Sequence, residues 1–153
     1  MADKTQVLIA GDGTPVPISY ADIGGGLYGG PVTNVEGTLL ASAVRAATNF
    51  TADQVNPNAR GVRVSYNITA VPGTDTITVQ IQGKDPVSGN YFTILAGAAQ
   101  VATGQKPDLI VYPGVTATAN VAVSEPLPRT WRVNVVHSAA SNFTYSVGFS
   151  RIA

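Results

Sequence analysis

Apolar and polar side chains alternate along the last part of the chain. Between residues 143 and 149, aromatic and aliphatic side chains are separated by Thr, Ser and Gly. A period of two indicates a β-strand with one buried face and one solvated face. Residues 131–135 alternate in the same way, and the connecting residues 138–142 have a length that suits a hairpin. We therefore predict that these two segments pair with each other.

The same period recurs through the middle of the chain. It is clearest in residues 62–69 and again in residues 76–82, and shorter apolar segments follow at 91–95, 109–112 and 115–123. Glycine and proline separate these segments, and Asp85–Asn90 has the residues of a hairpin loop.

Residues 38–47 fit two patterns. Their leucines, valine and alanines form a helical stripe in one reading and an alternating strand in the other. Alanine favours the helix. We nevertheless expect a strand, because all the segments that follow have strand character.

About eight short strands with no helix between them indicate an all-β fold, an antiparallel β-sandwich of jelly-roll type. We place this domain at residues 36–153. Its structural core is expected at the inward positions of the alternating segments, namely Val62, Val64, Tyr66, Ile77, Val79, Ile81, Trp131, Val133, Phe143, Tyr145 and Val147.

Residues 1–35 differ from the rest. Two apolar segments, Val7–Ala10 and Val16–Tyr20, flank a turn and are expected to form a small hairpin or a pair of extended segments. Residues 24–31 are mostly glycine, which loses the most backbone freedom on ordering and does not hold regular structure unaided.

Two interpretations of this extended, Gly-rich N-terminal arm stay open. It is either a flexible tail or an arm that orders against a partner. Its apolar segments favour the arm, because a disordered tail would be more polar. The residues expected to contact such a partner are Val7, Leu8, Ile9, Val16, Ile18 and Tyr20.

Composition narrows the class of partner. The chain has 153 residues, of which 44% are apolar and only 12% charged, about half the usual charged share. Nine basic residues balance nine acidic ones, whereas nucleic-acid binding would need a basic excess. No cysteine is present, and no apolar run approaches the roughly 20 residues that span a bilayer. Met1–Gln6 does not resemble a secretory signal. We expect synthesis in a cytoplasm and neither nucleic acid nor membrane as partner.

Catalytic chemistry is not expected. His137 is the only histidine, and a lone histidine at a strand end is usually a surface or hydrogen-bonded structural residue. The chain has no Gly-x-Ser-x-Gly motif, and its carboxylates are scattered singly. We therefore predict no enzyme, no catalytic residues, no cofactor and no metal. A paired-carboxylate glycosidase site stays open, because spacing in sequence does not give spacing in a sheet.

The arginines and aromatic residues allow two interpretations each. Arg129 and Arg132 flank Trp131, and arginines in so weakly charged a chain are either solvated or paired with acids at the end of the sandwich. Trp131 is most simply a core residue. Alternatively it stacks on a sugar together with other rings, for which Tyr91, Phe92 and Tyr112 are candidates.

Four blocks, in order along the chain, resemble a series of small structural proteins encoded in tailed-bacteriophage and prophage genomes. The blocks are Asn58–Val64, Ile81–Tyr91, Val111–Gly114 and Leu127–Val133. The resemblance covers residues 39–152 and is much weaker over the N-terminal arm. It implies a non-enzymatic component of the virion, made in the cytoplasm of a bacterial host.

Within that class we expect a capsid decoration (cementing) protein on the capsid surface. Its partner would be the major capsid protein, with strand addition by the arm and a homo-oligomer such as a trimer. One alternative is a tail, neck or head-fibre component of the same virion. The other is a carbohydrate-binding module that attaches to host-surface glycans.

Overall fold

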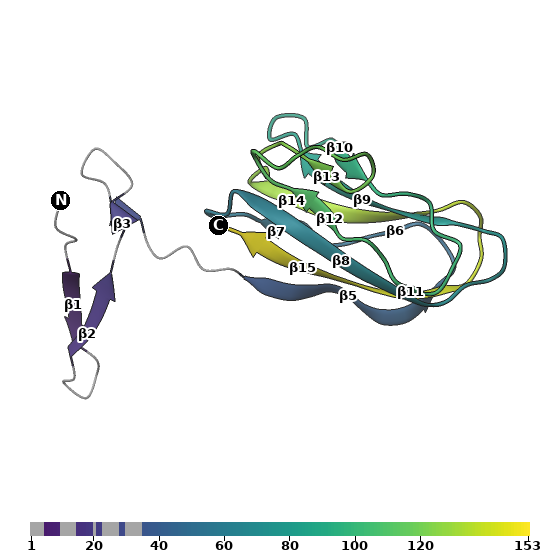
Figure 1. Cartoon of the computed structure of the whole chain (residues 1–153), viewed down its shortest axis with the longest axis horizontal. Coiled ribbons are helices and arrows are strands. Elements are labelled where there is room, and N and C mark those ends of the chain that lie inside the picture. The colour runs from purple at the N-terminus through teal and green to yellow at the C-terminus, as the bar shows by residue number, and fades with distance from the viewer. Residues whose placement is uncertain (1–4, 10–14, 20, 23–27, 30–34) are drawn as a thin grey trace. The chain divides into compact units, whose positions relative to one another are not determined.

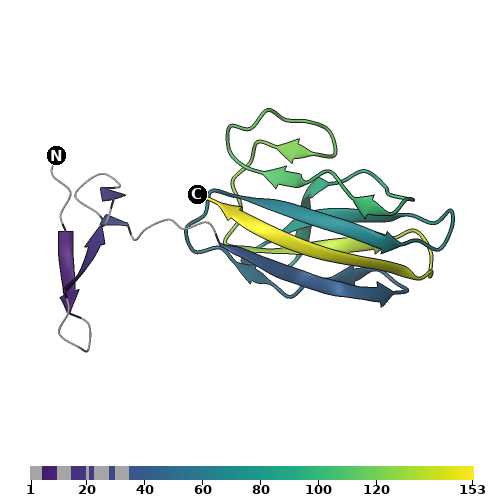
Figure 2. The same ribbon diagram turned by 60° about the horizontal axis from the view of Figure 1, so that its bottom comes forward.

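The computed structural model describes the chain in five ranges, and in the first four it describes only the backbone. These ranges are 5–9, 15–19, 21–22, 28–29 and 35–153. The chain divides into two compact units, residues 1–33 and residues 34–153. Figures 1 and 2 show the strands of each unit.

The N-terminal unit contains two small antiparallel pairs. In the first, β1 (Thr5–Ile9) pairs with β2 (Pro15–Ser19), so that Leu8 lies opposite Val16. In the second, β3 (Ala21–Asp22) pairs with β4 (Tyr28–Gly29). The antiparallel pairing of β1 with β2 corresponds to the small hairpin, one of the two arrangements expected for this segment. Most of the Gly-rich stretch lies outside the described residues.

The C-terminal unit, called the body below, contains the remaining described strands. They are β5 (Glu36–Arg45), β6 (Asn49–Phe50), β7 (Gln54–Val55), β8 (Gly61–Ala70), β9 (Ile77–Lys84), β10 (Tyr91–Ala96), β11 (Gly104–Gln105), β12 (Leu109–Val111), β13 (Ala122–Val123), β14 (Thr130–His137) and β15 (Phe143–Ile152).

Two sheets form the body. The five-stranded sheet has the order β10-β9-β14-β6, with β7 also paired to β14. The six-stranded sheet has the order β13-β12-β8-β15-β5, with β11 also paired to β8. Strands of both sheets run along the long axis of the body in Figure 1. The expected all-β sandwich is confirmed.

The principal strands pair from the outside of the sequence inward. β5 pairs with β15, β6 with β14, β8 with β12, and β9 with β10, all antiparallel. This nesting, folded over into two sheets, is the strand order of a jelly roll. The body strands outside this nesting, β7, β11 and β13, have two residues each, as does β6 within it.

The alternation in β8 shows why the sandwich forms. Val62 and Val64 are fully buried, whereas Arg63 between them is exposed. One face of each sheet is therefore apolar, and the two apolar faces pack together, which removes their side chains from water. Near the start of β14 and the end of β15, the buried ring of Trp131 meets the partly buried Phe149 edge-on, with 5.7 Å between ring centroids.

Every core position expected from the sequence is buried, each at 2% exposure or less. Beyond these, the buried cluster contains Ile68, Leu95, Leu109, Val111, Leu127 and Val135.

The predicted hairpin between residues 131–135 and 143–149 is wrong. β14 pairs with β9, β6 and β7 in one sheet, whereas β15 pairs with β5 and β8 in the other. The connection 138–142 crosses from one sheet to the other. Both segments present large apolar side chains to the same core, and facing sheets satisfy that pattern as well as neighbouring strands do.

Two further strand predictions have different outcomes. Residues 38–47 are confirmed as largely a strand, β5, whose alanines lie at an exposed sheet edge. The strand expected at 115–123 is wrong except for β13. Most of this segment is a turn, in which Asn120 has φ of 60° and the Val121 N–H donates to the carbonyl of Thr118 at 3.0 Å.

Candidate functional site

The residues expected to bind a capsid partner fall on the N-terminal hairpin. Val7, Leu8 and Ile9 belong to β1, and Val16 and Ile18 belong to β2. The backbone pairing brings these apolar positions into adjacent register. Tyr20 lies outside the described residues.

The outer face of the five-stranded sheet carries a network of amide side chains. Gln82 lies opposite Arg132, and Gln80 lies opposite Asn134, which in turn lies opposite Phe50. Asn134 Nδ2 donates to Gln80 Oε1 at 3.2 Å. The amides thus tie adjacent strands together on the side of the sheet that faces away from the core.

Arg132 stacks with aromatic rings on this face. Its Cζ atom lies 3.3 Å from the centroid of the Tyr91 ring and 4.6 Å from that of Phe50. Its Nε donates to Gln82 Oε1 at 2.9 Å. The two rings and one amide therefore fix the guanidinium, although within residues 35–153 it has no carboxylate within ion-pair distance.

Asp53 is the centre of a second group, called the Asp53 cluster. Lys84 Nζ donates to Asp53 Oδ2 at 2.8 Å, and the Tyr91 hydroxyl donates to Asp53 Oδ1 at 2.5 Å. The hydrogen bond from Lys84, followed by that from Tyr91, lowers the pKa of the Asp53 carboxyl, and the Asp53 carboxylate raises the pKa of Lys84. Both charged side chains are one-third exposed, so the pair remains accessible to solvent and to a ligand.

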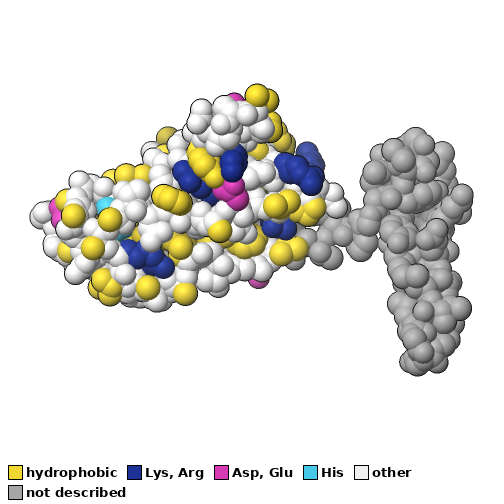
Figure 3. Space-filling view, turned by 180° about the vertical axis from the view of Figure 1, so that it is seen from behind, with side chains coloured by type: hydrophobic (Ala, Val, Ile, Leu, Met, Phe, Trp, Pro, Cys, Tyr) yellow, Lys and Arg dark blue, Asp and Glu magenta, His cyan; other side chains and the backbone are white. Residues whose placement is uncertain are grey.

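A cleft of about 670 Å³, called the loop cleft, adjoins the Asp53 cluster. Asp53 and Lys84 form part of its wall, Val55 and Pro86 add apolar surface, and Arg129 lines it as well. Figure 3 shows the molecule from behind, where Lys and Arg side chains gather around a small acidic patch on a mostly uncharged surface. The loop cleft has the size of small-molecule sites in proteins.

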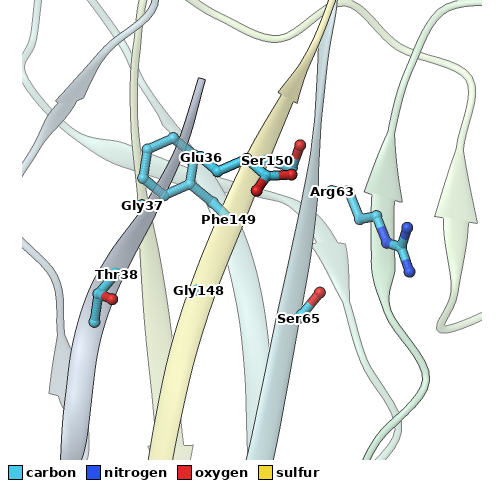
Figure 4. A pocket seen from close by; sticks show the side chains of 8 residues that line it. All are labelled: Glu36, Gly37, Thr38, Arg63, Ser65, Gly148, Phe149 and Ser150. Atoms are coloured by element: carbon cyan, nitrogen blue, oxygen red, sulfur yellow. The ribbon is translucent and has the colours of Figure 1, made fainter. Parts of the chain in front are cut away.

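A shallower groove of about 550 Å³ lies on the six-stranded sheet (Figure 4). Its floor includes Gly148 of β15, and Ser65 and Arg63 of β8 line one side. Asp108 forms an ion pair with Arg63. The remaining groups are hydroxyls, the Glu36 carboxylate and the Phe149 ring.

His137 is a buried structural residue, as expected. It is 9% exposed, and its Nε2 lies 3.3 Å from the Tyr145 hydroxyl, with the Phe143 ring edge-on at 5.2 Å. Burial lowers the pKa of His137, with a smaller contribution from the charge of Arg45. Burial also raises the pKa of Tyr145 to about 12. The pair is neutral near pH 7 and holds the two sheets together at this end of the body.

Three arginines gather at the opposite end of β14, called the arginine end. Arg151 Nη2 donates to the Val55 carbonyl at 2.7 Å, and the Arg129 carbonyl accepts from the Asn56 N–H at 2.7 Å. The backbone of Arg60 lies beside both segments, because its N–H donates to the Ile152 carbonyl at 2.9 Å and its carbonyl accepts from the Leu127 N–H at 3.0 Å. None of the three has a carboxylate within ion-pair distance in the described body, which favours the solvated interpretation over pairing with acids. The arginine that pairs with an acid in this part of the chain is Arg63, with Asp108.

The aromatic residues considered for sugar stacking do not form one surface. Trp131 is fully buried, so its ring cannot stack on a sugar. Tyr91 lies on the outer face against Arg132, while Phe92 packs beside Gly83. Tyr112 lies near Arg60, which donates to its hydroxyl at 3.3 Å.

The association of Asp53, Lys84, Tyr91 and Arg132 was not predicted from the sequence. Alternation placed Arg132 on the face opposite Trp131, which was a usable signal. It did not indicate that residue 53 would lie beside residue 84, because that contact depends on the order β9-β14-β7 within the sheet.

Neither a metal site nor a membrane-spanning helix occurs among the described residues. No group of three or more His, Cys, Asp or Glu side chains there is arranged to hold a metal ion. In the same part of the chain, no helix has the length and apolar character to cross a membrane. Comparison with models of known families and with curated proteins gives no match to this chain.

Proposed function

We propose that this chain is a non-enzymatic structural protein of a tailed-bacteriophage virion. The most specific form of this proposal is that the chain is a capsid decoration protein, which binds the outer capsid lattice and stabilises the head. It would be made in the bacterial cytoplasm and located on the capsid surface, with the major capsid protein as partner and a homo-oligomer as its assembled state.

The observation that carries the proposal is the division of the chain into a hairpin unit and a jelly-roll body. The body supplies a folded block with a continuous core, and the hairpin unit supplies paired strands rich in Val, Ile and Leu. Strand addition to a partner sheet gains main-chain hydrogen bonds without requiring particular side chains. A fold alone does not determine function, so the sequence resemblance to phage structural proteins supplies the class.

The arginine end makes one end of the body chemically different from the other, which supports this assignment. The Val35 carbonyl accepts from the Arg151 N–H at 2.9 Å, so the chain enters the body beside these arginines. Arginines without carboxylate partners are suited to bind acidic groups on another protein. Hairpin and arginine end would then act on the same partner, and repeated attachment over a symmetric lattice would add avidity.

A binding experiment tests the proposal. Capsid shells lacking this protein are mixed with the full chain or with a chain that starts at Ile23, and binding is measured by co-sedimentation. We expect the full chain to bind and the shortened chain to remain in the supernatant, with an unchanged circular dichroism spectrum of the body. Binding by the shortened chain with the affinity of the full chain would contradict the role of the hairpin.

A matched pair of charge insertions separates the arm from general surface effects. Leu8→Asp changes β1, whereas Val87→Asp changes a residue that is 94% exposed in the β9–β10 hairpin of the body. We expect Leu8→Asp to abolish lattice binding and Val87→Asp to leave it intact. Equal loss in both variants would point to non-specific adsorption instead.

The rival assignments within the virion are a tail, neck or head-fibre component. These share the same requirement for a folded body and differ from a decoration protein in the number of copies per virion. A carbohydrate-binding module that depends on Trp131 is not supported, because that side chain is inside the core.

A further inference from the structure

Apart from Arg129, the residues of the loop cleft and of the charged face beside it have no role in the proposed lattice binding. We propose that they form a binding site for a short oligosaccharide, with Asp53 as the acceptor of sugar hydroxyls and Lys84 and Arg129 as donors. This inference goes beyond the structural role and does not depend on the location of the protein.

The chemistry of the wall matches that of a sugar. Sugar hydroxyls donate and accept hydrogen bonds at closely spaced positions, so their site needs donors and acceptors side by side. The Asp53 carboxylate lies 2.8 Å from the Lys84 ammonium, and the Tyr91 hydroxyl lies 2.5 Å from the same carboxylate. A carboxylate has about four acceptor positions, so Asp53 keeps capacity for a ligand beyond these two bonds.

The cleft also supplies apolar surface for the C–H faces of the sugar rings. Val55, Pro86 and Pro128 line it. At about 670 Å³ the cleft lies within the range of 300–1,000 Å³ typical of small-molecule sites. It therefore has room for more than one sugar ring.

The polar groups are held in place before a ligand arrives. Asp53 is fixed by two hydrogen bonds, and Arg132 is fixed by Gln82 and by the Tyr91 ring. The Lys84 hydrogen bond lowers the pKa of Asp53, so the acceptor stays ionised over a wide pH range. Groups fixed in this way lose little conformational entropy on binding, which favours affinity.

The face continues from the cleft toward Phe50, whose side chain is 59% exposed. Arg132 lies between this ring and Tyr91. A further sugar ring can therefore stack on Phe50 while its hydroxyls reach the amides of Gln80 and Asn134.

Charge selects among ligands. Lys84 and Arg129 balance Asp53 and Asp85 in the cleft wall, and Arg132 on the adjoining face adds one further cation. The Asp85 carboxylate is already engaged by its own loop, where it accepts from the Val87 N–H at 2.8 Å and from the Ser88 hydroxyl at 2.7 Å. This excess is too small for a polyphosphate backbone, and it favours a sugar that carries a carboxylate over a neutral one.

Saturation-transfer NMR on the full chain tests the proposal with three trisaccharides, trigalacturonic acid, chitotriose and maltotriose. We expect transfer to trigalacturonic acid and weaker transfer to at least one neutral trisaccharide. Asp53→Asn should weaken binding about tenfold or more, because it removes an ionised acceptor. Arg129→Gln should reduce the affinity for trigalacturonic acid more than the affinity for a neutral trisaccharide, because it removes a cation and keeps a donor.

The matched control is Asp75→Asn, the same change at a carboxylate that does not line the cleft. It should bind as the unmodified chain does. Asp53 is one-third exposed and its ion pair is a surface pair, so Asp53→Asn is expected to fold, which the amide NMR spectrum checks. Absence of transfer to all three trisaccharides, or equal binding by Asp53→Asn and Asp75→Asn, would overturn the proposal, and neither result would bear on lattice binding.

Discussion

The Cζ atom of Arg132 lies 3.3 Å from the centroid of the Tyr91 ring. In a body with few carboxylates, an aromatic face takes the place of an acidic partner for this cation. The same arrangement recurs at Arg45, whose Cζ lies 4.7 Å from the Tyr145 ring centroid and whose Nη1 donates to the Tyr145 carbonyl at 2.8 Å. Rings and carbonyls therefore stabilise cations that ion pairs would stabilise in a more charged protein.

Arg132→Lys should destabilise the body although it keeps the charge. Lysine has no planar guanidinium to stack on Tyr91 and no Nε–H to donate to Gln82. We expect a loss of about 1 kcal/mol in the free energy of unfolding, the typical value of one such hydrogen bond or stacked cation. Urea unfolding followed by tryptophan fluorescence measures it. A stability equal to that of the unmodified chain would show that the stack contributes nothing.

Gly61→Ala should be strongly destabilising because no space exists for a methyl group. A Cβ at Gly61 would collide with the carbonyl oxygen of Val111 and come within 2.8 Å of the Tyr112 ring. A backbone atom in the adjacent strand cannot move away without breaking the β8–β12 pairing. We expect a loss of about 1–3 kcal/mol or more.

Gly148→Ala is the control for that change. It lies in β15, and a Cβ added there would have the Gly37 carbonyl oxygen as its nearest neighbour, 3.4 Å away. Thermal unfolding of the two variants side by side should show a large decrease in Tm only for Gly61→Ala. Equal decreases in Tm would indicate that the close approach of Gly61 to β12 is not the cause of the destabilisation.

The stability of the body should fall on mild acidification because of His137. Its pKa is lowered in the folded state by burial, so the folded protein binds a proton less readily than the unfolded chain. The contribution of His137 to stability is complete above the ordinary pKa of 6.5 and decreases as the pH falls through that value. Between about pH 7.5 and pH 5, we expect a decreasing free energy of unfolding in the unmodified chain.

His137→Gln checks the origin of this slope. Glutamine can still bond to the Tyr145 hydroxyl but does not titrate, so the variant should have a flatter dependence over the same pH range. An identical slope in both proteins would assign the pH dependence to other groups. The pKa values of Asp53 and Asp85 are lowered from 3.8, so these carboxyl groups titrate below the pH range of this comparison.

The arginine end should make lattice binding dependent on salt. Replacing Arg60, Arg129 and Arg151 together by Gln removes the cations that would bind acidic groups of the partner. We expect weaker co-sedimentation with capsid shells at low salt and a reduced dependence on salt concentration, since exposed charges are screened within about 10 Å at 0.1 M. Replacement of Lys106, which donates to the carbonyl of Thr103, is the control for loss of a positive charge elsewhere. If the triple variant bound as the control does at every salt concentration, the arginine end would be excluded as a lattice-binding surface.

The core could be predicted from sequence because alternation with a period of two identifies inward positions directly. Val62, Val79 and Val133 are buried for that reason. Pairing could not be predicted in the same way, because Trp131 and Phe143 point into one core from different sheets. The Asp53 cluster depends on that pairing, and its residues come from segments about thirty residues apart that no local pattern connects.

The copy number of this chain in purified virions, measured by quantitative mass spectrometry against the major capsid protein, tests the central proposal most directly. Lattice decoration predicts a copy number that is a sizeable fraction of that of the capsid protein. A few copies per virion would contradict decoration and favour a tail, neck or head-fibre component. No copies in the virion would contradict the structural assignment altogether.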